Sequence, residues 1–253
     1  MNFGGHKVLL HTITEAAGLF IGFRYYVYLK RKKGDSINSS NRLWIVIAAT
    51  IGAYVGSHLL GGFENPPAVF QSQNVLLYFY SNKTIVGGLL GGLIGVEVMK
   101  KAIKEKSASG DLFTYPLILA MIIGRIGCFS MGVHEETYGL PSSLPWAMKL
   151  GDDIPRHPVS LYEIIFLIAL WIFIASVNKK YVLEKGAMFK IFMIGYLSFR
   201  FLLDFIKPHY RYSFELSTIQ IACLAGLVYY HKYITHPREL LKGNTIELHF
   251  SVQ

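Results

Sequence analysis

Long apolar runs separated by short polar segments dominate the chain. A transmembrane helix takes about 20 consecutive, mostly apolar residues. Seven runs meet or approach this length, at about residues 8–29, 43–62, 84–99, 112–133, 159–178, 187–206 and 216–234. Apolar and polar residues do not alternate along these runs, as they would in the strands of a membrane β-barrel. The pattern predicts an all-α integral membrane protein with about seven transmembrane helices. No long repeat or linker divides the chain, so residues 1–253 are expected to form one polytopic domain.

The loops between the runs differ in charge. The three internal loops rich in lysine and arginine follow the first, third and fifth runs, and they begin at Lys30, Lys100 and Lys179. Loops with an excess of positive residues stay on the cytoplasmic side of a membrane. With seven spans, this bias predicts an N-terminus outside the membrane and a C-terminus in the cytoplasm.

Composition supports a membrane protein and excludes other classes. The chain is 52% hydrophobic and only 16% charged, whereas soluble proteins average about 25% charged residues. Its net charge of +9 would suit a nucleic-acid partner, but the charges lie in the loops between apolar runs. We therefore interpret them as an orientation signal that also favours contact with membrane lipids, and expect no nucleic-acid partner. Cys128 and Cys223 lie inside apolar runs without metal-ligand spacing, so neither a metal nor a cofactor is expected.

Several ionisable residues lie inside the predicted spans, where each costs about 2.5–3.5 kcal/mol on insertion scales. Arg24 and Glu97 lie near the cytoplasmic ends, where their side chains can extend to water. The others share the outer half of the membrane once the predicted orientation is imposed: His11, Glu15, His58, Arg125, Glu163, Arg200 and Asp204. Their common depth predicts a polar site near the outer face.

The predicted sixth span has a polar stripe. Tyr196, Arg200 and Asp204 are spaced at i, i+4 and i+8, so they share one helix face that can hold a guanidinium between a phenol and a carboxylate. Because guanidinium groups bind oxyanions in a bidentate fork, Arg125 and Arg200 are the candidates for gripping a phosphate. The alternative is a buried ion-pair network that only holds helices together.

Two further segments each allow two interpretations. Gly87, Gly91 and Gly95 are in GxxxG register, which favours close helix packing but would also leave room for a lipid. The long outer loop at residues 134–158 is acidic and rich in proline. It is either a cap over the site or an ordered connector.

Five short elements together resemble the bacterial prolipoprotein diacylglyceryl transferases. They occur in that family's order over about residues 84–225: Gly91–Val96 (GGLIGV), Gly124–Phe129 (GRIGCF, closing at Gly139), Arg156–Glu163 (RHPVSLYE), Gly195–Phe205 (GYLSFRFLLDF) and Ser217–Gln220 (STIQ). Each element alone is weak, but their joint order is specific.

The resemblance implies an activity and its partners. The donor would be phosphatidylglycerol or a related glycerophospholipid, and the acceptor the lipobox cysteine of a lipoprotein precursor. The reaction would take place at the outer face of the bacterial cytoplasmic (inner) membrane, in a multi-pass protein that needs no cofactor. Arg125 and Arg200 would neutralise the departing phosphate, with Tyr196 hydrogen-bonded to it. The residues expected to bind or orient the substrate are His58, Gly139, His157, Tyr162, Glu163 and Asp204.

The sequence departs from the family pattern near the expected reaction centre. Two asparagines of the pattern, a histidine and a tyrosine are replaced here by Cys128, Met131, Leu90 and Ala17 respectively. Our hypothesis is that His11, paired with Glu15 one helical turn away, or His58 replaces the missing histidine as the base. The departures leave two alternatives open: a diverged paralogue that modifies another acceptor, and a non-enzymatic lipid-binding or transport protein.

Overall fold

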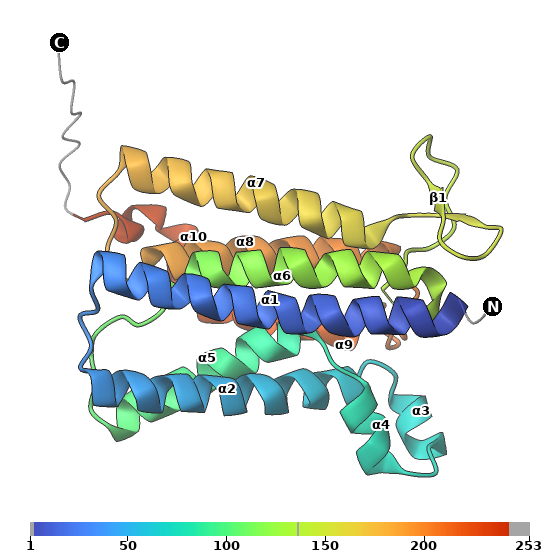
Figure 1. Cartoon of the computed structure of the whole chain (residues 1–253), viewed down its shortest axis with the longest axis horizontal. Helices are drawn as coiled ribbons and strands as arrows, with labels where there is room; N and C mark the ends of the chain where they lie inside the picture. The colour runs from blue at the N-terminus through green and yellow to red at the C-terminus, as the bar shows by residue number, and fades with distance from the viewer. Residues whose placement is uncertain (1–2, 136, 243–253) are drawn as a thin grey trace.

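The computed structural model describes residues 3–135 and 137–242 (Figure 1). All seven predicted runs are helical. The long helices are α1 (Phe3–Lys33), α2 (Ser39–Gly62), α5 (Ile85–Ala102), α6 (Asp111–Met131), α7 (Val159–Lys180), α8 (Ala187–Leu203) and α9 (Thr218–Tyr229). The shorter elements are α3 (Pro66–Gln71), α4 (Val75–Ser81), α10 (His231–Thr235), β1 (Met148–Lys149), β2 (Pro155–Arg156) and the 3-10 turns Gly132–His134, Asp204–Ile206 and Pro237–Leu240.

The helices differ in whether they are long and apolar enough to cross a membrane. Within the described residues, three are both long and apolar enough, at Ser39–Gly62, Asp111–His134 and Val159–Lys180. Helix α8 has 17 residues and α9 has 12, shorter than the roughly 20 residues that a span takes. The prediction of an all-α, membrane-type fold is confirmed at this level, while seven spans and their orientation stay predictions.

The helices form two groups that meet through α9 (Figure 1). In one group α6 packs against α1, α7 and α8; in the other α2 and α5 form a close pair. Helix α9 contacts α8 on one side and α5 on the other. The buried core lies mainly on α6 to α9 and includes Ile118, Leu167, Phe192 and Leu197.

Glycines set the close approach of α2 and α5. A Cβ atom added to Gly91 would lie 2.2 Å from the carbonyl oxygen of Gly52, and one added to Gly87 would lie 2.3 Å from that of Gly56. Small residues at such crossings let helix backbones touch. Of the two interpretations of these glycines, close packing is therefore the one that the structure supports.

A second glycine contact brings α1 against the end of α6. A Cβ atom on Gly127 would lie 2.0 Å from Thr14 Oγ1 and 3.0 Å from His11 Cδ2. Gly18 is similarly tight against the carbonyl oxygen of Ala120, at 2.8 Å. The absence of a side chain at residue 127 thus allows His11 to reach the residues that follow on α6.

The outer loop is held to the bundle by backbone hydrogen bonds. The amide of Leu140 donates to the carbonyl of Ile206 at 2.8 Å, and the amide of His157 donates to the carbonyl of Leu140 at 3.1 Å. Strands β1 and β2 pair antiparallel within the loop. These contacts make it an ordered connector between α6 and α7, at the same end of the bundle as the start of α1 (Figure 1).

Candidate active site

Two buried arginines share one buried carboxylate where α6, α7 and α8 meet. Nε of Arg125 lies 2.9 Å from Oε1 of Glu163, and Nη1 of Arg200 lies 3.7 Å from Oε2 of the same residue. The side chain of Glu163 is only 1% exposed. A buried charge this deep needs compensating partners, and Glu163 lies near the start of α7, where it can reach both neighbouring helices.

The polar stripe of α8 is arranged differently from our expectation. The Tyr196 hydroxyl donates to Glu163 at 2.7 Å, the carboxylate that both arginines share. Among the described residues the phenol therefore contacts the carboxylate and forms no hydrogen bond with Arg200. Asp204 Oδ1 lies 3.8 Å from Nη2 of Arg200 and 3.2 Å from Nε2 of His209. The Ser217 hydroxyl donates to the other oxygen of Asp204. Asp204 therefore joins α8 to the start of α9.

Two N–H donor atoms of Arg200 lack a hydrogen-bond acceptor in the described part of the chain. Its Nε and Nη1 atoms are buried and have no hydrogen-bond acceptor among the described residues. The separation of 3.7 Å from Glu163 is too long for a hydrogen bond. Leaving a buried donor unsatisfied costs about 1–3 kcal/mol, and more for a charged group. Such a cost is recovered when an oxyanion ligand accepts these donors, so the arrangement fits a phosphate.

Lys207 is a residue that our sequence reasoning missed. It follows α8 and is 6% exposed. Its positive charge is close enough to Arg200 and Arg125 to be repelled by both. Burial, and then the charge of Arg200, lower the pKa of Lys207 to about 8. The spacing was available as a signal, since residue 207 continues the 196, 200, 204 stripe by one further helical step.

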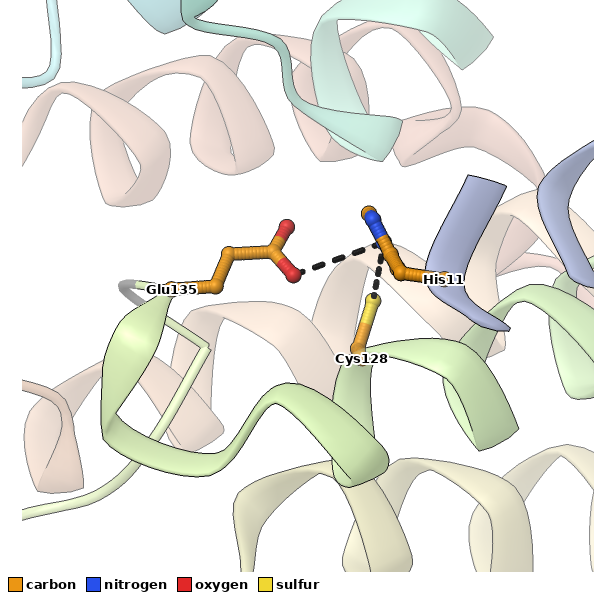
Figure 2. A group of neighbouring side chains, drawn as sticks. All are labelled: His11, Cys128 and Glu135. Atoms are coloured by element: carbon orange, nitrogen blue, oxygen red, sulfur yellow. Dashed lines mark hydrogen bonds and ion pairs between the residues drawn. The ribbon is translucent and has the colours of Figure 1, made fainter. Parts of the chain in front are cut away.

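A second polar group consists of His11, Cys128 and Glu135 (Figure 2). Nε2 of His11 lies 3.4 Å from Oε2 of Glu135 and 3.7 Å from Sγ of Cys128. Nη1 of Arg125 donates to the same sulfur at 3.4 Å, so the thiol connects His11 to the arginine pair.

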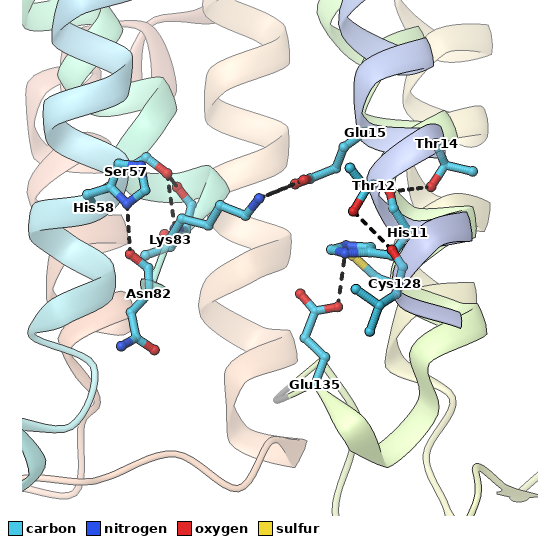
Figure 3. Close-up of polar contacts among 12 residues, drawn as sticks. His11, Thr12, Thr14, Glu15, Ser57, His58, Asn82, Lys83, Cys128 and Glu135 are labelled. Atoms are coloured by element: carbon cyan, nitrogen blue, oxygen red, sulfur yellow. Dashed lines mark hydrogen bonds and ion pairs between the residues drawn. The ribbon is translucent and has the colours of Figure 1, made fainter. Parts of the chain in front are cut away.

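The expected pairing of His11 with Glu15 does not form. Both carboxylate oxygens of Glu15 lie 2.6 Å from Nζ of Lys83, which extends across from the start of α5 (Figure 3). The carboxylate partner of His11 is Glu135 instead. Sequence spacing could not reveal this pair, because the two residues lie on different elements more than a hundred positions apart.

His58 is placed away from the thiol. Its Nδ1 atom lies 3.2 Å from the carbonyl oxygen of Asn82 (Figure 3) and 3.2 Å from that of Phe79. Its ring also stacks on Tyr80, with centroids 5.7 Å apart. These contacts tie α2 to the segment that leads into α5, which is a structural use of the side chain.

Three predicted binding residues gather in the outer loop and at the start of α7. The Tyr162 hydroxyl lies 3.2 Å from Nδ1 of His157 and accepts from Nε1 of Trp146 at 2.8 Å. A Cβ atom on Gly139 would lie 2.5 Å from Cβ of His157, so a glycine is needed for this packing. Within the described residues, none of the three predicted residues (Gly139, His157 and Tyr162) forms a hydrogen bond or ion pair with the two arginines.

Comparison with known proteins identifies the family. The family model described as prolipoprotein diacylglyceryl transferase matches residues 1–234. The chain belongs to this family. Proteins with the name phosphatidylglycerol–prolipoprotein diacylglyceryl transferase are similar to it in Cupriavidus metallidurans (37% identity; 48% of this chain and 45% of the relative), Nitratidesulfovibrio vulgaris (32%; 72% and 69%) and Photobacterium profundum (31%; 74% and 73%). The alignment thus spans less than half of the first relative and about 70% of the other two.

The departures from the diacylglyceryl transferase pattern take definite places in the fold. Cys128 lies beside Arg125, at the centre of the polar site. Leu90 packs into the core from α5, and a Cβ atom on Gly226 of α9 would lie 2.9 Å from its Cδ2 atom. The position where the transferase pattern has a histidine therefore serves here in apolar packing between α5 and α9.

Proposed function

We propose that the protein transfers a diacylglyceryl group from phosphatidylglycerol to the cysteine thiol of a lipoprotein precursor. Family membership and the names of the three relatives support this activity. The structural observation that carries it is that the buried Nε and Nη1 atoms of Arg200 have no hydrogen-bond acceptor among the described residues. Arg200 lies beside Arg125 and Glu163. Phosphate oxygens fit this demand in charge and geometry.

The proposed reaction is a displacement at carbon. The acceptor thiolate forms a bond to the glyceryl carbon of the lipid, the bond from that carbon to the phosphate oxygen breaks, and glycerol phosphate leaves with the electron pair. Arg125 and Arg200 stabilise the negative charge on the leaving group. Glu163 positions both guanidinium groups, and Tyr196 fixes Glu163 through its hydroxyl.

The acceptor thiol must lose its proton, because the thiolate is the nucleophile and a free thiol has a pKa of about 8.5. His11 is the candidate base, since its Nε2 atom lies near Glu135 and close to Arg125 through Cys128. Of the two candidates considered from the sequence, His58 is the weaker because its Nδ1 atom contacts backbone carbonyls.

We propose that the chain lies in the bacterial inner membrane with seven spans and its N-terminus outside. Basic residues occupy the last turns of α1, α5 and α7, and these three ends lie together at one end of the bundle (Figure 1). The positive-inside rule assigns that end to the cytoplasm. Arg125, Glu163 and Arg200 are near the opposite ends of their helices, toward the outer face.

The activity is tested directly with a purified donor and acceptor. The protein is incubated with phosphatidylglycerol labelled in its diacylglyceryl group and with a lipobox peptide, and the products are separated. We expect a thioether-linked diacylglyceryl peptide and free glycerol phosphate in equal amounts. If a known family member forms product and this protein does not, the proposal is contradicted; consumption of lipid without peptide modification would favour another acceptor.

The buried lysine predicts a pH dependence of lipid binding. Lys207 is charged below its pKa of about 8 and neutral above it, so its contribution to phosphate binding is present at lower pH and lost as the pH rises through about 8. We expect the KM for phosphatidylglycerol to rise about tenfold, equivalent to about 1.4 kcal/mol. Lys207→Arg retains its charge at high pH and should remove this rise. Identical KM profiles for the two proteins would contradict the prediction.

A further inference from the structure

Three potential metal ligands converge, each from a different element (Figure 2), and one of them, Cys128, contacts Arg125. His11 comes from α1, Cys128 from the last turn of α6, and Glu135 from the residue after the 3-10 turn. One ligand atom from each lies within 4.8 Å of the others. Neither their sequence positions nor their spacing follows a metal motif, and the sequence accordingly predicted no metal.

Two of the three ligand separations fit a tetrahedral coordination shell. With zinc–nitrogen and zinc–oxygen bonds of about 2.1 Å and a zinc–sulfur bond of about 2.3 Å, two ligands of one tetrahedron lie about 3.6 Å apart for nitrogen and sulfur and about 3.4 Å for nitrogen and oxygen. The corresponding distances from Nε2 of His11 are 3.7 Å to Cys128 and 3.4 Å to Glu135. The ligand atoms of Cys128 and Glu135 lie within 4.8 Å of each other, so a side-chain adjustment would complete the shell around an ion.

The hydrogen bonding of the group is incomplete without a ligand. Oε2 of Glu135 is buried and accepts no hydrogen bond within the described residues, although His11 is 3.4 Å away. A buried carboxylate oxygen with a free lone pair is costly. A metal ion would use that lone pair together with those of His11 and Cys128.

Arg125 supplies a hydrogen bond to the sulfur ligand of this group. A metal-bound thiol is deprotonated, and Nη1 of Arg125 donates to Sγ of Cys128 at 3.4 Å. Hydrogen bonds of this kind to a ligand atom orient it and tune the metal. The charge of Arg125 is in turn balanced by Glu163 on its other side.

We propose that His11, Cys128 and Glu135 bind one zinc ion, whose remaining position takes the thiolate of the acceptor cysteine next to Arg125. A set of one nitrogen, one sulfur and one oxygen ligand suits zinc, and three protein ligands with one open position are typical of catalytic zinc. This inference rests on the proposed transferase function for its second half. On binding to zinc, the acceptor thiol releases its proton to water. In this arrangement His11 is a zinc ligand and does not act as the general base.

The metal site is tested first without any lipid or peptide. The purified full-length protein is stripped with a chelator and titrated with Zn²⁺, and separately with Co²⁺ as a spectroscopic substitute. We expect one equivalent of zinc per chain and a near-ultraviolet thiolate-to-cobalt charge-transfer band. Absence of the band and of stoichiometric zinc in the wild-type protein overturns the proposal, whether or not the enzyme is active.

Matched variants assign the ligands. Cys128→Ser should abolish the cobalt band and weaken zinc binding by at least about 10–100-fold, the range seen even for indirect partners. Cys223→Ser, at the other cysteine of the chain, should leave both unchanged. His11→Ala and His58→Ala form a second pair in which only the first should lose zinc. A band that persists in Cys128→Ser contradicts the assignment.

A final comparison separates the metal site from its role in the reaction. Transferase activity is measured on the zinc-free protein and after zinc is restored. We expect activity to fall on removal and return with zinc. Full activity without zinc would overturn thiol activation by the metal while leaving the binding site intact. If the protein binds zinc but is inactive both without zinc and after zinc is restored, the result would count against the transferase function and not against the metal site.

Discussion

Arg200→Lys is expected to lower the rate of diacylglyceryl transfer by about 10²–10³-fold, the usual cost of removing one donor that stabilises a developing charge. Lysine keeps the positive charge but presents a single ammonium group in place of the planar fork. In the wild-type protein, Nε and Nη1 of Arg200 are among the buried donors without an acceptor in the described residues, and the variant cannot supply both. The measurement is kcat and kcat/KM with labelled phosphatidylglycerol and a lipobox peptide.

The control for this prediction is Arg24→Lys on α1. Arg24 is exposed and lies toward the basic end of α1. Among the described residues, it is not one of those that contact Glu163 or the two site arginines, so activity should be unchanged. Thermal unfolding of both variants checks that the bundle is intact. If Arg200→Lys turns over at the wild-type rate, Arg200 does not hold the phosphate.

Gly91→Ala is expected to destabilise the bundle strongly. The added Cβ atom would lie 2.2 Å from the carbonyl oxygen of Gly52, and because that atom is backbone, α2 and α5 must move apart. Forcing extra volume into a packed contact costs about 1–3 kcal/mol, occasionally more. The measurement is the midpoint of thermal unfolding in detergent, which should fall by several degrees.

Gly88→Ala is the matched control on the same helix. Its Cβ atom would meet only Ala53 O at 3.7 Å and Ser57 Cβ at 3.8 Å, which are ordinary contacts. Since alanine favours a helix over glycine by up to about 1 kcal/mol, Gly88→Ala should be neutral or slightly stabilising. Equal unfolding midpoints for the two variants would mean that α2 and α5 are not held by this crossing.

The helices were predictable because their signal is local. Apolar runs of about 20 residues cannot satisfy their backbone in lipid except as helices, and each predicted run is helical in the structure. The polar stripe Tyr196, Arg200 and Asp204 was likewise readable from helical spacing alone. The spacing of these three residues places them on one helix face whatever the rest of the chain does.

The site was only partly predictable. The cost of charge in a membrane singled out Arg125, Glu163 and Arg200, and these do meet. Glu135 and Lys207 escaped notice because they lie just outside the apolar runs, where a charged residue needs no explanation. Their importance comes from burial and neighbours, which depend on how the loop after α6 and the turn after α8 fold back on the bundle.

By itself the sequence determined the helical class of this protein, the ionisable residues that lie inside its apolar runs, and the motifs of its family. These follow from hydropathy, helical periodicity and residue order, which are properties of single segments. Only the tertiary structure decided which charges become partners: Glu15 binds Lys83, while His11 faces Glu135 and Cys128. The physical reason is that an ion pair or a coordination shell requires atoms within about 4 Å, and helix packing, through glycines such as Gly127, sets those distances.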